Sequence, residues 1–68
     1  MTALGSNVRQ QRLRKALTQE KLAASADLDP TYISGIVRGV RNPSILSVVR
    51  IAKALGTTVS TLSKGVDG

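Results

Sequence analysis

The 68-residue chain contains no cysteine and no histidine, and its single tyrosine is its only aromatic residue. Without cysteine there is no disulfide to stabilise a small fold and no thiolate to hold a metal ion. Without histidine the commonest general base and the commonest neutral metal ligand are missing. Paired carboxylates and glycine-rich phosphate loops are also missing, so the sequence predicts neither an enzyme nor a metal or cofactor site.

Long hydrophobic runs are absent as well. No apolar stretch is long enough to span a bilayer, and the N-terminus has no unbroken apolar segment typical of a signal peptide. The first helix that the sequence predicts lacks the broad apolar face of a membrane-surface binder. These features predict a cytoplasmic protein without a membrane partner.

Basic residues, in contrast, are plentiful. Ten Lys and Arg against four Asp and Glu give a formal net charge of +6, which favours polyanionic partners for so small a domain. The first helix is rich in cations and no acid precedes Glu20; the cations are Arg9, Arg12, Arg14 and Lys15. Since many small basic proteins bind no nucleic acid, charge alone gives only a modest preference for DNA.

The length predicts one domain covering residues 1–68, with an ordered core at about 4–63 and a frayed tail at 64–68. Apolar periodicity and capping residues predict an all-α fold of five helices, at about 6–15, 19–26, 30–39, 45–55 and 59–62. The expected N-caps are Thr18, Asp29, Ser44 and Thr58. The expected buried positions are Leu4, Val8, Leu22, Ala23, Ala26, Ile33, Ile36, Val37, Val48, Ile51, Ala52 and Leu55.

The predicted helix 30–39 separates into two faces at about 100° per residue. Ile33, Ile36 and Val37 form the apolar face. The opposite face carries Pro30, Thr31, Ser34, Gly35 and Arg38, with Tyr32 at the boundary. A face with so few bulky side chains can approach base edges closely in the major groove, N-terminal residues first. Arg38 and Arg41 would flank this face and contact phosphates.

Each of these residues also has an ordinary structural interpretation. Thr31 and Ser34 could be plain exposed polar residues, and Arg38 and Arg41 could be solvated charges. Tyr32 could be half-buried packing. The functional interpretation gains weight from two short helices joined by a three-residue turn within a basic chain.

Four stretches recur at the spacings of one family: TQEKLA at 18–23, YISGI at 32–36, RGVRNPS at 38–44 and IAKALG at 51–56. From Leu4 to Leu62 the chain resembles the helix-turn-helix domain of the Cro and lambda-repressor-like superfamily, and more narrowly the xenobiotic-response-element type of bacterial and phage regulators. The stretch LDPTYISGIVRGVRNPS is also similar to the controller proteins of restriction–modification systems. These commonly show a DRTYISGIERG-RNPS pattern.

The resemblance implies a five-helix bundle that binds double-stranded DNA as a homodimer on a two-fold symmetric operator, without a small-molecule ligand. The base-facing positions match Pro30, Thr31, Tyr32, Ser34 and Gly35. The phosphate-contacting positions match Thr18, Gln19, Arg38, Arg41 and Asn42, together with backbone amides of the loop after the third helix.

Four positions depart from the family pattern. Val37 stands where the family often has a glutamate that pairs internally with an arginine at the position of Arg12. Arg12 is therefore expected to turn to solvent, to carbonyl groups or to a DNA phosphate. Pro30 replaces an arginine that reads guanine in controller proteins. Ala16 and Asp27 replace glycines at turns that need left-handed backbone.

A dimer surface is expected on the fourth and fifth helices, formed by Leu46, Val49, Val59, Leu62 and also Val66. An isolated surface leucine at Leu46 is the alternative. The alternative function is the antitoxin of a toxin–antitoxin pair, for which only the few residues after Leu62 could supply a toxin-binding tail.

Overall fold

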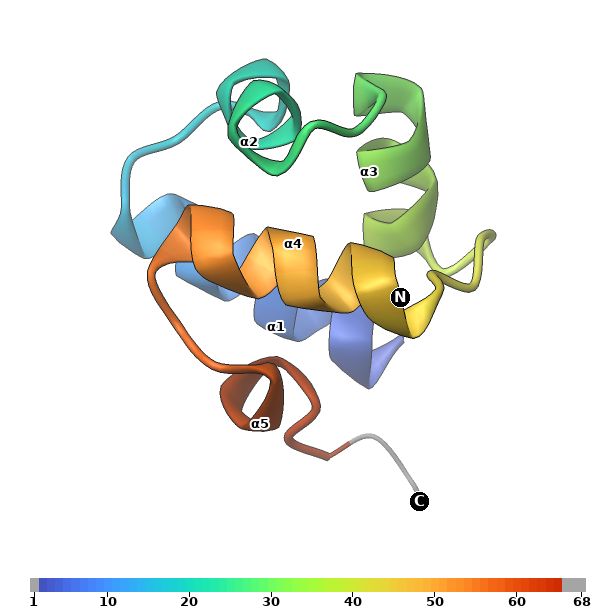
Figure 1. The fold of residues 1–68 in the computed structure, drawn as a ribbon. Helices are drawn as coiled ribbons and strands as arrows, with labels where there is room; N and C mark the ends of the chain where they lie inside the picture. Colours follow the sequence, from blue (N-terminus) through green and yellow to red (C-terminus); the bar gives the residue numbers. More distant parts are fainter. Residues whose placement is uncertain (1, 66–68) are drawn as a thin grey trace.

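The computed structural model describes residues 2–65, which form five helices and no strand. They are α1 (Ala3–Arg14), α2 (Gln19–Ala26), α3 (Pro30–Arg38), α4 (Ile45–Leu55) and α5 (Val59–Leu62). Figure 1 shows α4 crossing the centre of the molecule, with α2 on one side of it and α5 on the other. The five-helix prediction is confirmed. Within residues 2–65 no helix is long and apolar enough to cross a membrane.

Hydroxyl and carboxylate caps fix where the helices begin. The side chains of the four predicted caps, Thr18, Asp29, Ser44 and Thr58, each accept a hydrogen bond from a backbone amide of the first turn. A fifth cap, Thr2, escaped the sequence prediction. Its hydroxyl accepts from the Gly5 amide at 3.0 Å, so α1 begins at Ala3 and not near Ser6.

Gly5 is part of α1 although glycine disfavours helix, and a close contact with α3 explains why. It lies where α1 meets the C-terminal end of α3. A Cβ atom at this position would overlap the carbonyl oxygen of Val37 and lie 2.9 Å from that of Ile36. Gly5 therefore allows the two backbones to approach closely, and this approach fixes α3 against α1.

The apolar faces of the helices meet in one core. All the predicted core residues but one are buried: Val8, Leu22, Ala23, Ala26, Ile33, Ile36, Val37, Val48, Ile51, Ala52 and Leu55. The exception is Leu4, which is partly buried and packs against the core from its edge. Leu62 is also completely buried, so the prediction that it forms part of a dimer surface is wrong. In a helix of four residues, Leu62 is the side chain that anchors α5 to the core.

Asn7 holds the end of α5 against α1. Its Nδ2 donates to the carbonyl oxygens of Leu62, at 2.8 Å, and Lys64, at 2.6 Å. These bonds satisfy carbonyl groups that a helix end leaves without partners. Fraying from residue 64 onward was expected, but Lys64 is hydrogen-bonded to α1. Val66 and the rest of the predicted tail lie outside the described residues.

Arg12 takes one of the three routes that the sequence left open. Its Nη1 donates to the carbonyl oxygen of Leu17 at 2.8 Å, while its Nε is buried without a partner within residues 2–65. The guanidinium group is thus hydrogen-bonded to a backbone carbonyl inside the protein, whereas its contact with a phosphate stays a prediction. The two turns that lack glycine, at Ala16 and Asp27, adopt left-handed φ angles of 54° and 56°, as expected.

Candidate nucleic-acid interface

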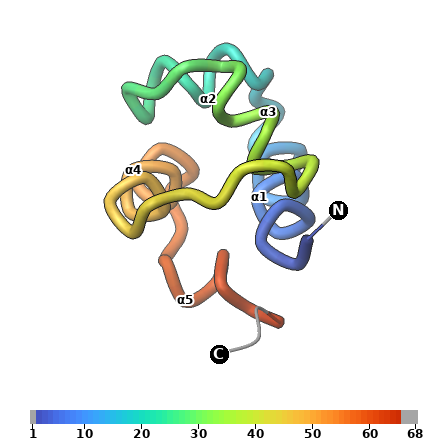
Figure 2. Tube along the Cα trace, turned by 90° about the vertical axis from the view of Figure 1, so that its right-hand side faces the viewer, coloured from blue at the N-terminus to red at the C-terminus, as the bar shows by residue number. Residues whose placement is uncertain are grey.

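The turn between α2 and α3 sets the geometry of the candidate interface. Asp27 in left-handed geometry ends α2, and Asp29 caps α3 with its carboxylate 2.7 Å from the Thr31 amide. Leu28, between them, packs against the core. Figure 2 views the molecule from the side on which α3 lies and shows α2 and α3 together at one end, with the following loop crossing to α4.

The two faces of α3 differ as predicted. Ile33, Ile36 and Val37 are buried in the core. On the opposite face Thr31 is exposed and Ser34 is partly exposed. Pro30 and Arg38 are also exposed, at the two ends of the helix. The described part of the chain therefore leaves a strip of small side chains open along α3.

Gly35 corrects one part of this picture. It is buried, because the side chain of Arg41 lies over it: a Cβ atom on Gly35 would be only 2.5 Å from Cγ of Arg41. The prediction that Gly35 belongs to the bare face is therefore wrong. Helical periodicity places Gly35 on the correct side of α3 but says nothing about a loop that folds back over it.

Tyr32 joins α3 to the start of α4. Its hydroxyl group lies 3.3 Å from Oγ of Ser47 and accepts from the Ser44 amide at 3.3 Å. Ser44 and Ser47 are in turn 3.0 Å apart through their hydroxyl groups. The half-buried packing interpretation of Tyr32 is thus observed, whereas its base contact stays a prediction. Ser47, buried and polar, is a structural partner that the sequence reading missed.

Most of the residues expected to contact phosphates are exposed. Arg38, Arg41 and Asn42 are exposed in or near the α3–α4 loop, and Thr18 is exposed at the start of α2, while Gln19 is half-buried. Two of the loop amides are already hydrogen-bonded within the chain. The amides of residues 40 and 41 both donate to the carbonyl oxygen of residue 35, at 2.9 and 3.2 Å.

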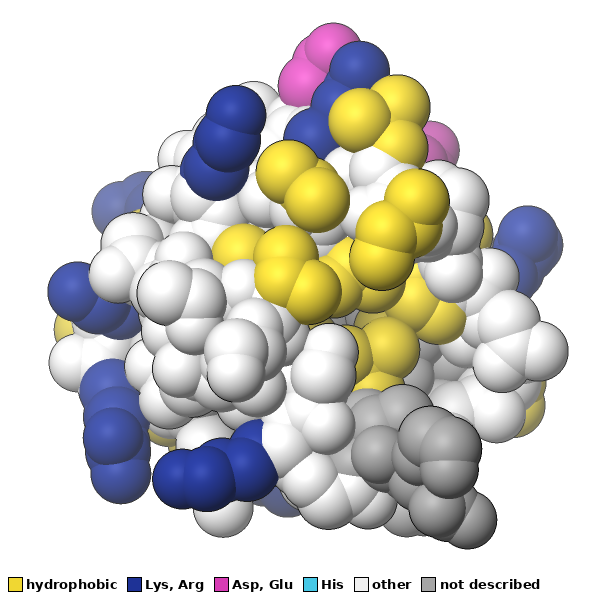
Figure 3. Space-filling model, turned by 60° about the horizontal axis from the view of Figure 1, so that its bottom comes forward, with side chains coloured by type: hydrophobic (Ala, Val, Ile, Leu, Met, Phe, Trp, Pro, Cys, Tyr) yellow, Lys and Arg dark blue, Asp and Glu magenta, His cyan; other side chains and the backbone are white. Residues whose placement is uncertain are grey.

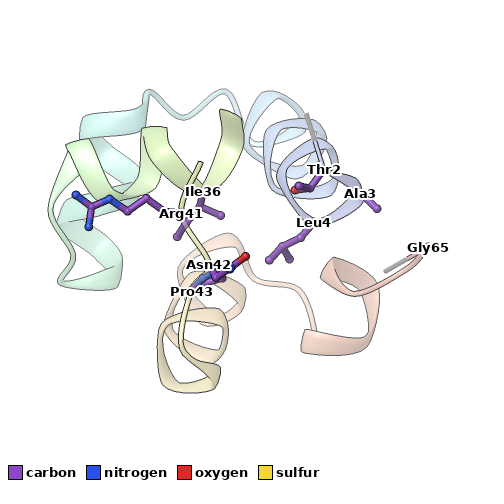
Figure 4. A pocket seen from close by; sticks show the side chains of 8 residues that line it. All are labelled: Thr2, Ala3, Leu4, Ile36, Arg41, Asn42, Pro43 and Gly65. Carbon is purple, nitrogen blue, oxygen red and sulfur yellow. The ribbon is translucent and has the colours of Figure 1, made fainter. Parts of the chain in front are cut away.

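The α3–α4 loop borders a hollow of about 340 Å³. Its walls come from the start of α1, the loop and the end of the described chain; the lining residues are Thr2, Ala3, Leu4, Ile36, Arg41, Asn42, Pro43 and Gly65. Figure 4 shows that the Arg41 side chain extends along α3, away from this hollow. The hollow therefore lies between the loop, the start of α1 and Ile36 of α3.

A second surface lies on α4 and α5. Leu46 is 58% exposed and its neighbour Ile45 is 73% exposed, while Val49 and Val59 are half-buried. Ile45 was not among the residues predicted for a dimer surface. Figure 3, turned to bring the α5 side forward, shows hydrophobic side chains gathered in the middle of this face and Lys and Arg side chains nearer its edges. An apolar area of this kind is typical of an interaction site.

The family of the chain follows from its match to known sequences. The family model described as helix-turn-helix covers residues 8–62, which include the open strip and the core that supports it. The chain belongs to the helix-turn-helix family. This family comprises DNA-binding regulators, in agreement with the predicted xenobiotic-response-element type.

Several relatives of the chain are controller proteins. The chain is 55% identical over 53 residues to control protein C.BamHI of Bacillus amyloliquefaciens, a match covering 76% of this chain and 65% of the relative. It is 39% identical over 64 residues to control protein C.MunI of Mycoplasma sp, covering 93% and 86%. The crystal structure of the restriction–modification controller protein C.AhdI from Aeromonas hydrophila superposes with a TM-score of 0.86 at 37% identity, covering 88% of this chain and 91% of that one.

Proposed function

We propose that the chain is a transcriptional regulator of the restriction–modification controller type, which binds double-stranded DNA in the cytoplasm. The observation that carries this proposal is the strip on α3: Thr31 and Ser34 face outward while Ile33 and Ile36 seal the opposite face in the core. A rigid helix with small polar side chains on its free side can enter the major groove and bring donors and acceptors to base edges.

Specificity comes from the first turns of α3. Thr31 and Ser34 offer hydroxyl groups that both donate and accept, and the Thr31 methyl group can contact a thymine methyl group. Tyr32 borders the strip from its position between α3 and α4. Pro30 brings no donor, so base contacts that depend on an arginine at this position are not made by this chain.

Phosphate contacts fix the orientation on the duplex. Thr18 and Gln19 at the start of α2 contact the backbone on one side of the groove, and Arg38, Arg41 and Asn42 contact it on the other. Because each neutralised phosphate releases counterions, affinity falls steeply as the salt concentration rises.

Two copies of the chain bind together through the α4–α5 surface. Burial of Ile45 and Leu46 against a second copy adds buried apolar area to the small core of a 68-residue chain and so stabilises the fold. A symmetric dimer presents two α3 helices about 34 Å apart, one turn of DNA, and so requires a palindromic site.

Selection of bound duplexes from a random pool tests the proposal. The expected product is a pair of inverted half-sites whose centres lie about 10 base pairs apart. The selected duplex should bind at least about 10³-fold more tightly than random DNA at the same salt concentration. Equal affinity for selected and random duplexes would contradict sequence-specific regulation.

A further inference from the structure

Gly35 and Arg41 are in direct contact although one belongs to α3 and the other to the loop beyond it. The nearest side-chain atoms to a Cβ built on Gly35 are Cγ, Cβ and Cδ of Arg41, at 2.5, 3.3 and 3.5 Å. All three belong to the aliphatic stem of Arg41. Gly35 is buried and Arg41 as a whole is exposed, so the stem covers the glycine while the charged end stays accessible.

The same glycine also holds the backbone of the loop. Its carbonyl oxygen accepts from the amides of Val40, at 2.9 Å, and Arg41, at 3.2 Å. Gly39 supplies the left-handed residue, with φ of 80°, that turns the chain back toward α3. Backbone and side chain of Arg41 are thus both held at Gly35, and Figure 4 shows the side chain extending from the loop along α3.

Gly35 follows Thr31 by four residues, so the two lie on the same side of α3. The Arg41 stem therefore borders the open strip. We propose that Gly35 is a positioning residue: its missing side chain makes a seat for the Arg41 stem, and the seat holds the guanidinium group at the edge of the DNA-facing strip. This inference rests on the proposed function, and it assigns Gly35 a role other than direct contact with a base.

Replacing Gly35 by alanine tests the seat. The new methyl group would lie 2.5 Å from Cγ and 3.3 Å from Cβ of Arg41, so the base of this side chain must shift and the guanidinium group is displaced with it. Alanine also favours helix over glycine. We expect Gly35→Ala to remain folded at 25 °C with a modest fall in unfolding temperature, yet to bind the selected duplex about 3- to 10-fold more weakly.

A double-mutant cycle distinguishes positioning from direct contact. Arg41→Ala should weaken binding of the selected duplex about 10-fold, and Gly35→Ala added to Arg41→Ala should change the affinity by less than about 2-fold. A Gly35→Ala effect that is equally large with and without Arg41 would overturn the proposal, because the glycine would then act on DNA by itself. Loss of the helical circular dichroism of Gly35→Ala at 25 °C would also overturn it, since the glycine would then be required for the fold itself and not for the position of Arg41.

The seat can also be observed without DNA. Nuclear Overhauser effects between the α protons of Gly35 and the γ protons of Arg41 are expected in the wild-type protein, and their absence would contradict the seat. If the wild type shows no preference for the selected duplex over random DNA, the proposed function fails first and the role of Gly35 fails with it. If the wild type prefers the selected duplex but the effects of Gly35→Ala and Arg41→Ala on affinity simply add, the seat is contradicted and the proposed function stands.

Discussion

Gly5 of α1 lies directly against the carbonyl group of Val37 at the end of α3. The contact joins the first helix to the helix that carries the candidate interface. It leaves no room for even one methyl group, and the obstacle is backbone, which cannot rotate away. The orientation of α3 on the bundle therefore depends on a residue more than thirty positions earlier in the chain.

Gly5→Ala is expected to lower the free energy of unfolding by about 1–3 kcal/mol, because the added methyl group forces α1 and α3 apart. Chemical denaturation followed by circular dichroism measures the change. Gly35→Ala is the matched control: it is the same substitution in a helix, but its nearest neighbours are side-chain atoms of Arg41 and not backbone, so its effect on stability should be smaller. Equal stability of Gly5→Ala and the wild type would show that the close approach does not constrain the fold.

Arg12→Ala should reduce stability without changing how DNA binding depends on salt. The substitution removes the hydrogen bond from Nη1 to the Leu17 carbonyl, which is worth about 1.5–3 kcal/mol for a charged donor. The exposed Arg9 on the same helix is the control, since Arg9→Ala should leave stability nearly unchanged. If Arg12→Ala instead lowers the slope of log K against log salt by about one, Arg12 contacts a phosphate after all.

Leu46→Glu is expected to separate the proposed dimer. A carboxylate at the centre of an apolar interface must be desolvated on association, so the dimer should weaken at least about 10-fold. Sedimentation equilibrium measures this. Leu13 is 56% exposed on α1, against 58% for Leu46, and Leu13→Glu should leave the association unchanged. Equal association of both variants would place the interface elsewhere.

Much of the fold could be predicted because its signals are local. A capping side chain lies within a few residues of the amide that it binds, so Thr18, Asp29, Ser44 and Thr58 locate four helix starts from the sequence alone. The apolar stripes of α3 and α4 likewise locate the core. The start of α1 was placed too late because Gly5 disfavours helix, and its compensating contact with α3 is visible only in three dimensions.

The parts of the site that could not be predicted depend on contacts distant in the sequence. Nothing local shows that Arg41 lies over Gly35, because the path of the loop decides it. Leu62 was assigned to the surface since a four-residue helix is too short to show which face is buried. Ser47 lies on a helix whose role appeared to be apolar packing, yet it completes a polar link to Tyr32.

The affinity of a Thr31→Glu variant for the selected duplex tests the central claim most directly. Thr31 is exposed, so the change should leave the unfolding temperature within a few degrees of the wild type. If α3 enters the groove at this residue, the added negative charge meets the strong negative potential of DNA, and binding should weaken about 100-fold or more. Gln10→Glu, on the exposed side of α1, makes the same change of net charge and should weaken binding by less than about 3-fold. Equal loss of affinity in the two variants would contradict the placement of α3 in the major groove.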